Sequence, residues 1–407
     1  MNKLAHRLTQ LRKQVGRSAL ISASGAVEEG LRSRLNDSSL SIRHSSSKKK
    51  ISDSVLAKKL GAEVLSEGLI YLRTVHSLSS IHDLYNAQNL PRNFRYWPES
   101  INKACESLLF IDTETTGLSG GVGTLVFLLG VAEIKNNIVI NHQLLLNGMA
   151  GEVAMLKWFN QKLTQKQTLV SYNGKSFDIP LLVNRFRLQK IPSPLLTLKH
   201  IDLLHWIRRL HKNAWPDCRL PTAEKYCLNF IRKGDVSGAE APHIWSQLIR
   251  NGNVEQLKPL VRHHFWDVLS LVGILDYLLV KLNPKEQENI DVYSVANYFH
   301  ALGKVDKAKK ILESNLKTLC ERGLILLAKI YRKESNYEAA LLIWSNLAKK
   351  DHEISLEFLA KHYEHVCKQY DVSLVYTKQL LSVSKSPLHV KREQRLLRKM
   401  NSFKKFD

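Results

Sequence analysis

The sequence predicts an α/β domain, with a mixed sheet flanked by helices, followed by an all-α helical-repeat domain. Between residues 107 and 282, apolar runs of strand length alternate with stretches of helical spacing, and glycine or asparagine turns separate them. Beyond residue 288, alanines and aromatic residues recur every 32 residues, which is typical of stacked helical hairpins. With 407 residues, the chain is long enough for two or three such units.

The elements of the first region can be placed in order. Three strands come first, and the short turns between them indicate an antiparallel meander. A helix, a strand and a second helix follow. The second helix should begin near Pro180, because proline suits the first turn of a helix. One or two long helices should then run to the proline at position 284. The predicted bounds are 108–111, 124–134 and 138–146 for the strands of the meander, 152–163 for the next helix, 168–172 for the next strand and 254–282 for the long helical segment.

Two regions flank this domain. Residues 55–106 are expected to form an accessory hairpin, with strands at 61–65 and 68–72, and then a connection. After the domain, Ala296, Ala328 and Ala360 are spaced 32 residues apart. Small residues at such intervals occur where paired helices touch. The segment 288–385 therefore resembles tetratricopeptide repeats, the alternative being an unrelated helical bundle, and 386–407 is expected to be a basic tail.

The charge distribution indicates a polyanionic partner. The chain has 60 Lys and Arg against 37 Asp and Glu, a formal net charge of +23, and such a surplus attracts nucleic acid or anionic surfaces. Residues 1–50 hold eleven of the basic and three of the acidic residues, in a serine-rich stretch. We expect residues 1–54 to be a disordered leader, with an organelle transit peptide as the alternative.

Composition also excludes several classes of protein. No apolar run reaches the ~18 residues that a membrane-spanning helix requires, so no membrane association is expected. The cysteines number five and include no closely spaced pair. They support neither a disulfide framework nor a cysteine-based zinc site, and a cytoplasmic location fits them best.

One strand carries the first candidate site residues. Asp112 and Glu114 are two positions apart in a strand whose preceding residues are apolar, so their carboxylates leave the same face. Buried carboxylates that face one another repel, and they stay ionised when cations lie between them. Carboxylate oxygens without cysteine or histidine partners suit Mg²⁺ or Mn²⁺ better than zinc. A pair of such ions is therefore expected.

Two further acids occur in similar settings. Asp178 follows a strand at the point where a helix begins, and Asp267 lies on an apolar helix where an isolated charge is costly. His263 stands four residues before Asp267, so one helical turn brings its imidazole above that carboxylate. This is the placement of a general base that takes a proton from a metal-bound water. His264 is the competing candidate.

At this point the sequence resembles a known family. The four acids match, in order and context, those of the DnaQ-like (DEDD) 3′–5′ exonucleases of the ribonuclease H-like fold. A closer resemblance is to the bacterial YprB-type ribonuclease H-like domain, over residues 60–282. The segments that carry the resemblance are Asp112 to Gly121, Tyr172 to Asp178, Asp202 to His205 with Arg208 and Arg209, and Asp267 to Leu271.

The resemblance implies a metal-dependent nuclease in which Asp112, Glu114, Asp178 and Asp267 hold two Mg²⁺ or Mn²⁺ ions and His263 acts as base. One position departs from the family, because the histidine-type branch places its base five residues before the last acid, where this chain has Arg262. A spacing of four belongs to the tyrosine-type branch.

The expected activity is hydrolysis of phosphodiester bonds by a 3′–5′ exonuclease. A structure-selective endonuclease on the same site, or a non-catalytic scaffold that binds nucleic acid or protein, are the alternatives. The helical repeats are expected to bind a protein partner. Whether the substrate is DNA or RNA, its polarity, the partner and the oligomeric state stay open at this level.

Overall fold

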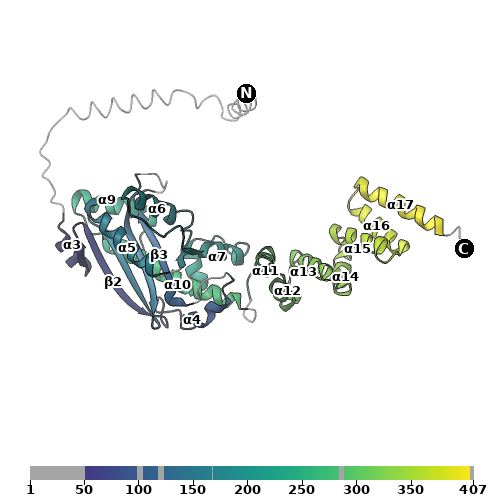
Figure 1. Cartoon of the computed structure of the whole chain (residues 1–407), viewed down its shortest axis with the longest axis horizontal. Helices are drawn as coiled ribbons and strands as arrows, with labels where there is room; N and C mark the ends of the chain where they lie inside the picture. Colours follow the sequence, from purple (N-terminus) through teal and green to yellow (C-terminus); the bar gives the residue numbers. More distant parts are fainter. Residues whose placement is uncertain (1–50, 99–103, 118–122, 167, 284–287, 404–407) are drawn as a thin grey trace, which may run out of the picture. The chain divides into compact units, whose positions relative to one another are not determined.

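A computed structural model of the chain describes residues 51–98, 104–117, 123–166, 168–283 and 288–403 (Figure 1). Residues 1–50 of the predicted leader and residues 118–121 of the first motif lie outside these ranges. The last leader residues, 51–54, are described, and their predicted disorder is wrong at Asp53, where helix α3 (Asp53–Leu60) begins. The remaining chain, from residue 50 onward, forms one compact unit. The order of its helices and strands confirms the predicted fold class: a mixed sheet flanked by helices, followed by a helical region.

Within the described ranges, the sheet has seven strands in the order β1-β2-β5-β4-β3-β6-β7. The strands β3, β4 and β5 form the predicted antiparallel meander. Strand β6 pairs in parallel with β3, and β7 pairs in parallel with β6. The strand bounds are β1 Glu63–Ser66, β2 Leu69–Ser77, β3 Leu108–Thr115, β4 Val126–Lys135, β5 Ile138–Leu146, β6 Thr168–Ser171 and β7 Lys199–Asp202.

The first hairpin corrects one prediction. Its strands β1 and β2 form as expected, but β2 also pairs with β5 in nine consecutive register positions from Leu69 to Ser77. The hairpin therefore extends the main sheet and is not an accessory unit before it. Without β2, the backbone groups along the outer edge of β5 would have no strand partner. Helix α3 (Asp53–Leu60), which we had not predicted, packs against this hairpin through buried Leu56.

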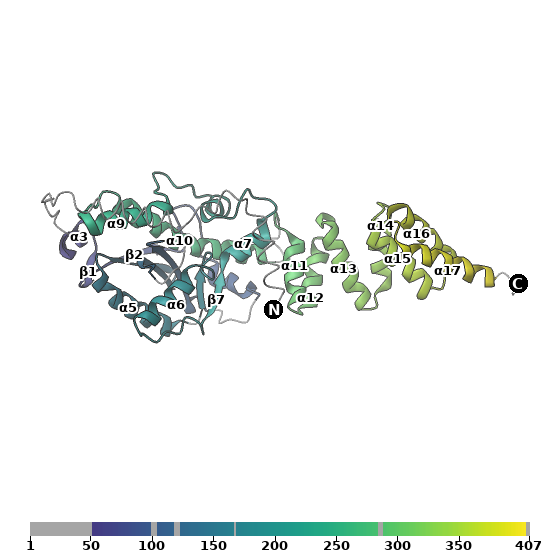
Figure 2. The ribbon, with the colours of Figure 1, turned by 90° about the horizontal axis from the view of Figure 1, so that it is seen from above.

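Side chains of β3 alternate between two cores. Leu109 and Ile111 pack with the helices α5 (Glu152–Gln165) and α6 (Asp178–Leu188), whereas Leu108 and Phe110 pack on the opposite face. That opposite face is covered by the helices α7 (Leu203–His211) and α10 (Leu257–Leu282). Figure 2 shows the sheet between α5 and α6 on one side and α10 on the other.

Helix α10 is a single helix of 26 residues within the predicted helical segment. It crosses β3, β4 and β5, and its buried face includes Leu271, Ile274 and Leu278. Between α7 and α10 the chain forms α8 (Leu220–Ala223), a π-helical turn (Glu224–Leu228) and α9 (Ala241–Asn251).

The helical region consists of three hairpins and a last helix. Ala296, Ala328 and Ala360 are fully buried where the helices meet, as the spacing predicted. Whether these hairpins are tetratricopeptide repeats stays a prediction. The helix bounds are α11 Val292–Ala301, α12 Val305–Ser314, α13 Glu321–Lys333, α14 Tyr337–Ala348, α15 Glu353–His365, α16 Tyr370–Val383 and α17 Pro387–Phe403.

The last helix corrects a second prediction, because most of the expected basic tail is α17. Its Leu396 is fully buried, and Arg395 and Lys399 donate hydrogen bonds to the carboxylate of Glu364 on α15. The burial of Leu396 and the two hydrogen bonds to Glu364 stabilise the packing of α17 against α15 and α16. Among the described helices, none has the length and apolar character needed to cross a membrane.

Candidate active site

The first two acids reach the site from β3. Asp112 and Glu114 share the face of Phe110, which is the face that α10 covers. They lie where β3 passes the end of its parallel neighbour β6, because the paired positions end at Phe110 and Val170. The carboxyl ends of parallel strands are the edge at which α/β proteins place their sites.

Asp178 reaches the site through a tight turn that Asp202 holds. The carboxylate of Asp202, at the end of β7, accepts hydrogen bonds from the backbone N–H groups of Asn173 (2.8 Å) and Lys175 (3.1 Å). A side chain could not be added at Gly174, because its Cβ would lie 2.3 Å from the Oγ of Ser171. The turn thus fixes the start of α6, where the hydroxyl of Thr113 donates a hydrogen bond to Asp178.

Asp267 and His263 come from one face of α10, as their spacing predicted. The Nε2 atom of His263 lies 3.2 Å from Oδ2 of Asp267 and 3.8 Å from Oε1 of Glu114. Its Nδ1 lies 2.9 Å from both carboxylate oxygens of Asp235. A hydrogen on Nδ1, donated to Asp235, therefore leaves Nε2 facing the acids.

His264 occupies a different environment. Its ring is fully buried between α10 and the sheet, where its Nδ1 lies 3.0 Å from the amide nitrogen of Gln143 and its Nε2 lies 3.2 Å from the carbonyl oxygen of Asp112. Gly130 makes room for it, since a Cβ there would lie 2.6 Å from the ring. Burial lowers the pKa of His264 to about 4. This histidine ties α10 to β3, and its ring nitrogens are both engaged.

The four acids act on one another electrostatically. Burial raises the pKa of Asp112 well above its ordinary value, and the charges of Asp267, Asp178 and Glu114 raise it further. Burial, together with Asp267 and Asp178, raises the pKa of Glu114 to about 8. Burial raises the pKa of Asp178 to about 6, although the hydrogen bond from Thr113 opposes this. The structure therefore brings all four predicted acids within electrostatic reach of each other.

Sequence reasoning missed the cation in this cluster. Arg232, whose side chain is 6% exposed, donates hydrogen bonds to Asp267 (2.6 Å) and to both oxygens of Glu224 (2.6 and 2.7 Å). Its Nη1 lies 3.2 Å from Asp235. No spacing rule points to Arg232, because it lies in an irregular segment after the π-helical turn. The apolar setting of Asp267 was the signal that a partner was required.

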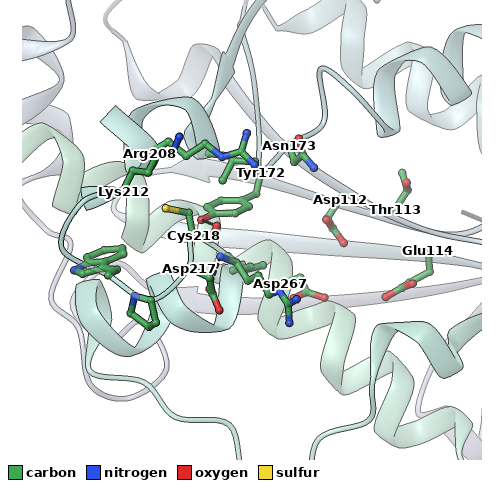
Figure 3. A pocket seen from close by; sticks show the side chains of 15 residues that line it. Asp112, Thr113, Glu114, Tyr172, Asn173, Arg208, Lys212, Asp217, Cys218 and Asp267 are labelled. Carbon is green, nitrogen blue, oxygen red and sulfur yellow. Dashed lines mark hydrogen bonds between the residues drawn. The ribbon is translucent and has the colours of Figure 1, made fainter. Parts of the chain in front are cut away.

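Three of the four acids line a cleft of about 710 Å³ that continues toward a group of cations. Asp112, Glu114 and Asp267 lie along it, and Arg208, Lys212 and Arg219 line its other part. Figure 3 shows Tyr172 beside Arg208, on the side toward Asp112. The hydroxyl of Tyr172 donates to the carbonyl of Cys218 (2.6 Å), which fixes the ring in this position.

The residues present fit a hard divalent cation. The acids offer carboxylate oxygens, and repulsion among them disfavours their ionised form unless a cation compensates. One oxygen of Glu114, one of Asp267 and a ring nitrogen of His263 all lie within 4.8 Å of one another. Mg²⁺ and Mn²⁺ match such an oxygen-rich set.

Comparison with known proteins defines the class. The model of the RNase_H superfamily matches residues 109–279, which include β3, β6 and the part of α10 that carries the candidate residues. The domain is thus ribonuclease H-like, as the motifs predicted. A family B DNA polymerase of the hyperthermophilic archaeon Pyrobaculum calidifontis also matches, with a TM-score of 0.37, 14% identity and 56% of this chain covered. The match covers 29% of that polymerase chain.

A second comparison, with a bacterial relative, identifies the family within this superfamily. The YprB protein of Bacillus subtilis (strain 168) is 32% identical over 332 residues, which cover 75% of this chain and 79% of the relative. The chain belongs to the YprB family.

The raised acid pKa values predict how the metal-free protein depends on pH. Glu114, with a pKa of about 8 against an ordinary 4.5, binds more protons in the folded than in the unfolded state between these values. The free energy of unfolding should therefore fall as pH rises from 5 to 8. In Glu114→Gln this pH dependence is absent. The free energy of unfolding of the variant, relative to that of the parent, should therefore increase by on the order of 2 kcal/mol as the pH rises from 5 to 8.

Urea unfolding in EDTA at several pH values measures this difference, with Glu255→Gln, at an exposed position, as control. Parallel stability profiles for Glu114→Gln and the parent would contradict the assigned environment of Glu114.

Proposed function

We propose that the protein is a metal-dependent nuclease of the DnaQ-like (DEDD) type that removes nucleotides from a 3′ end. This proposal is supported by one observation. The carboxylates of Asp112, Glu114, Asp178 and Asp267 lie close to one another, at the carboxyl ends of strands in a ribonuclease H-like domain. In this reading, these four carboxylates hold two Mg²⁺ or Mn²⁺ ions. Such ions would activate a water and stabilise the leaving 3′ oxygen when bound.

The chain's own residues have distinct parts in this proposal. His263 takes the proton of the attacking water at Nε2, because its Nδ1 is engaged by Asp235 and its Nε2 faces Glu114 and Asp267. Arg208 on α7 and Lys212 directly after this helix, both exposed, contact phosphates of the strand that lies in the cleft. In this assignment the helical region from residue 288 onward is a separate module that binds a protein partner.

The test is a cleavage assay of the full chain with Mg²⁺ or Mn²⁺ on 5′-labelled single-stranded and duplex DNA and RNA. A ladder that shortens from the 3′ end supports the proposal. Discrete internal cuts indicate a structure-selective endonuclease, and binding without cleavage indicates a scaffold. Asp112→Asn should abolish cleavage, whereas Asp306→Asn, an exposed acid of α12, should leave it unchanged. Cleavage by Asp112→Asn at the parent rate would reject the site.

The two adjacent histidines should differ in their effects. His263→Ala should reduce kcat by about 10² to 10⁴, the range for loss of a general base. His264→Ala opens a cavity and removes the link to β3, so it should lower thermal stability more than His263→Ala does. Steady-state kinetics and thermal unfolding of both variants check this. If His263→Ala binds Mn²⁺ with the affinity of the parent, His263 is a base and not a metal ligand. Full activity of His263→Ala would refute the assignment of the base.

The cleft cations should act on substrate binding. In Arg208→Gln/Lys212→Gln, the KM for an oligonucleotide should rise at unchanged kcat, because phosphate contacts are lost outside the acid cluster. The slope of log affinity against log salt should fall in magnitude by about 2. Lys157→Gln/Arg187→Gln removes two exposed cations that do not line the cleft and is the matched control. An equal effect of both pairs would indicate general charge attraction without a defined path.

A further inference from the structure

The guanidinium of Arg232 makes contacts with three carboxylates at once. Its Nε and Nη2 bind both oxygens of Glu224, Nη2 also reaches Oδ1 of Asp267, and Nη1 lies 3.2 Å from Asp235. The rigid planar fork of arginine suits such an arrangement, whereas the point charge of lysine cannot reproduce it.

The anchor of this guanidinium is itself fixed. Glu224 is fully buried at the start of the π-helical turn, and it accepts a further hydrogen bond from the hydroxyl of Ser270 on α10. The ring of His82 contacts Ser270 Oγ at 2.7 Å and stacks on Phe230 at a centroid distance of 3.9 Å. The pair Glu224–Arg232 is thereby held against α10 at Asp267 and, one turn later, at Ser270.

The consequence for Asp267 is that its two oxygens differ. Oδ1 is occupied by Arg232, and Oδ2 faces Nε2 of His263 at 3.2 Å. The same Nε2 atom lies 3.8 Å from Glu114, so Oδ2 is the oxygen of Asp267 that shares a neighbour with Glu114. Asp267 would consequently present a single oxygen to a metal ion.

The same guanidinium also affects His263. Its Nη1 lies 3.0 Å from Nδ1 of His263, but both are donors when Nδ1 carries a hydrogen, so Asp235 is the acceptor for each. By holding Asp235, Arg232 keeps that carboxylate where it fixes the orientation of the imidazole. Loss of the fork would release both the acid and the base.

We propose that Arg232 is the positioning residue of this site, which fixes Asp267 as a one-oxygen metal ligand and, through Asp235, keeps Nε2 of His263 toward the acids. This inference rests on the proposed function, since it assigns a role to Arg232 in metal binding and in turnover. The substitution Arg232→Lys can test whether the geometry or only the charge of Arg232 matters, because lysine keeps the positive charge and loses the planar fork.

The decisive variant is therefore Arg232→Lys in the full chain. Calorimetric titration of the metal-free protein with Mn²⁺ should show an affinity about 10- to 100-fold lower than that of the parent, the usual cost of losing an outer-shell partner. The kcat should fall as well, while the KM for an oligonucleotide stays the same. Arg250→Lys, at an exposed position on α9, should match the parent in each measurement. Parent-like Mn²⁺ affinity and kcat in Arg232→Lys would overturn the proposal.

A second variant separates the two roles and guards against a folding defect. Asp235 is partly exposed, and its carboxylate contacts Arg232 and His263. Asparagine has nearly the same shape, so Asp235→Asn should fold normally. It should lower kcat about 10- to 100-fold with Mn²⁺ affinity unchanged. Parent-like kcat in Asp235→Asn would overturn the role assigned through His263. Circular dichroism and metal-free thermal unfolding establish that each variant is folded.

Failure of the nuclease proposal would look different. If the parent binds Mn²⁺ but cleaves no DNA or RNA, the proposed activity is rejected, and the Mn²⁺ titration of Arg232→Lys still decides whether Arg232 orients Asp267. If the parent binds no Mn²⁺, both proposals are overturned.

Discussion

Repulsion among buried carboxylates is the constraint on which the site depends. Asp112, Glu114 and Asp178 all have raised pKa values because burial and neighbouring acids oppose their ionisation. Folding brings them together against this repulsion, so the surrounding residues must hold each one in place. Thr113 donates to Asp178, and Arg232 donates to Asp267. Each of these contacts offsets part of the cost of burying a charge.

Helix α10 and the sheet form the frame that keeps these groups in register. Several polar contacts join α10 to its surroundings within two helical turns. His264 reaches the backbone of Asp112, Asp267 binds Arg232, and Ser270 donates to Glu224. Because β3 supplies the first two acids and α10 the last, a shift of α10 along the sheet would separate them. The close fit of His264 over Gly130 opposes such a shift.

Helix α7 connects the cleft to the helical region. Arg208 of this helix and Lys212, which follows its last residue, line the cleft, while Trp206 on the helix packs edge-to-face against Tyr298 of α11 at 4.9 Å. The carbonyl of Leu210 accepts a hydrogen bond from the backbone of Asp291 at 2.9 Å. One helix thus takes part in two interfaces, so the helical region contacts the element that carries the cleft cations.

The sequence by itself determined the antiparallel meander, because the turns between its strands are short. It also determined that Asp112 and Glu114 share one face of a strand and that His263 pairs with Asp267, since these follow from periods of 2 and 3.6 residues. It also determined the 32-residue spacing of the buried alanines. Only the tertiary structure decided that β2 extends the main sheet, that α17 packs on the preceding helices, and that Arg232 binds Asp267. Each of these joins residues distant in the chain or lying in irregular segments. Local periodicity carries no information about such contacts, because long-range packing and charge pairing select them.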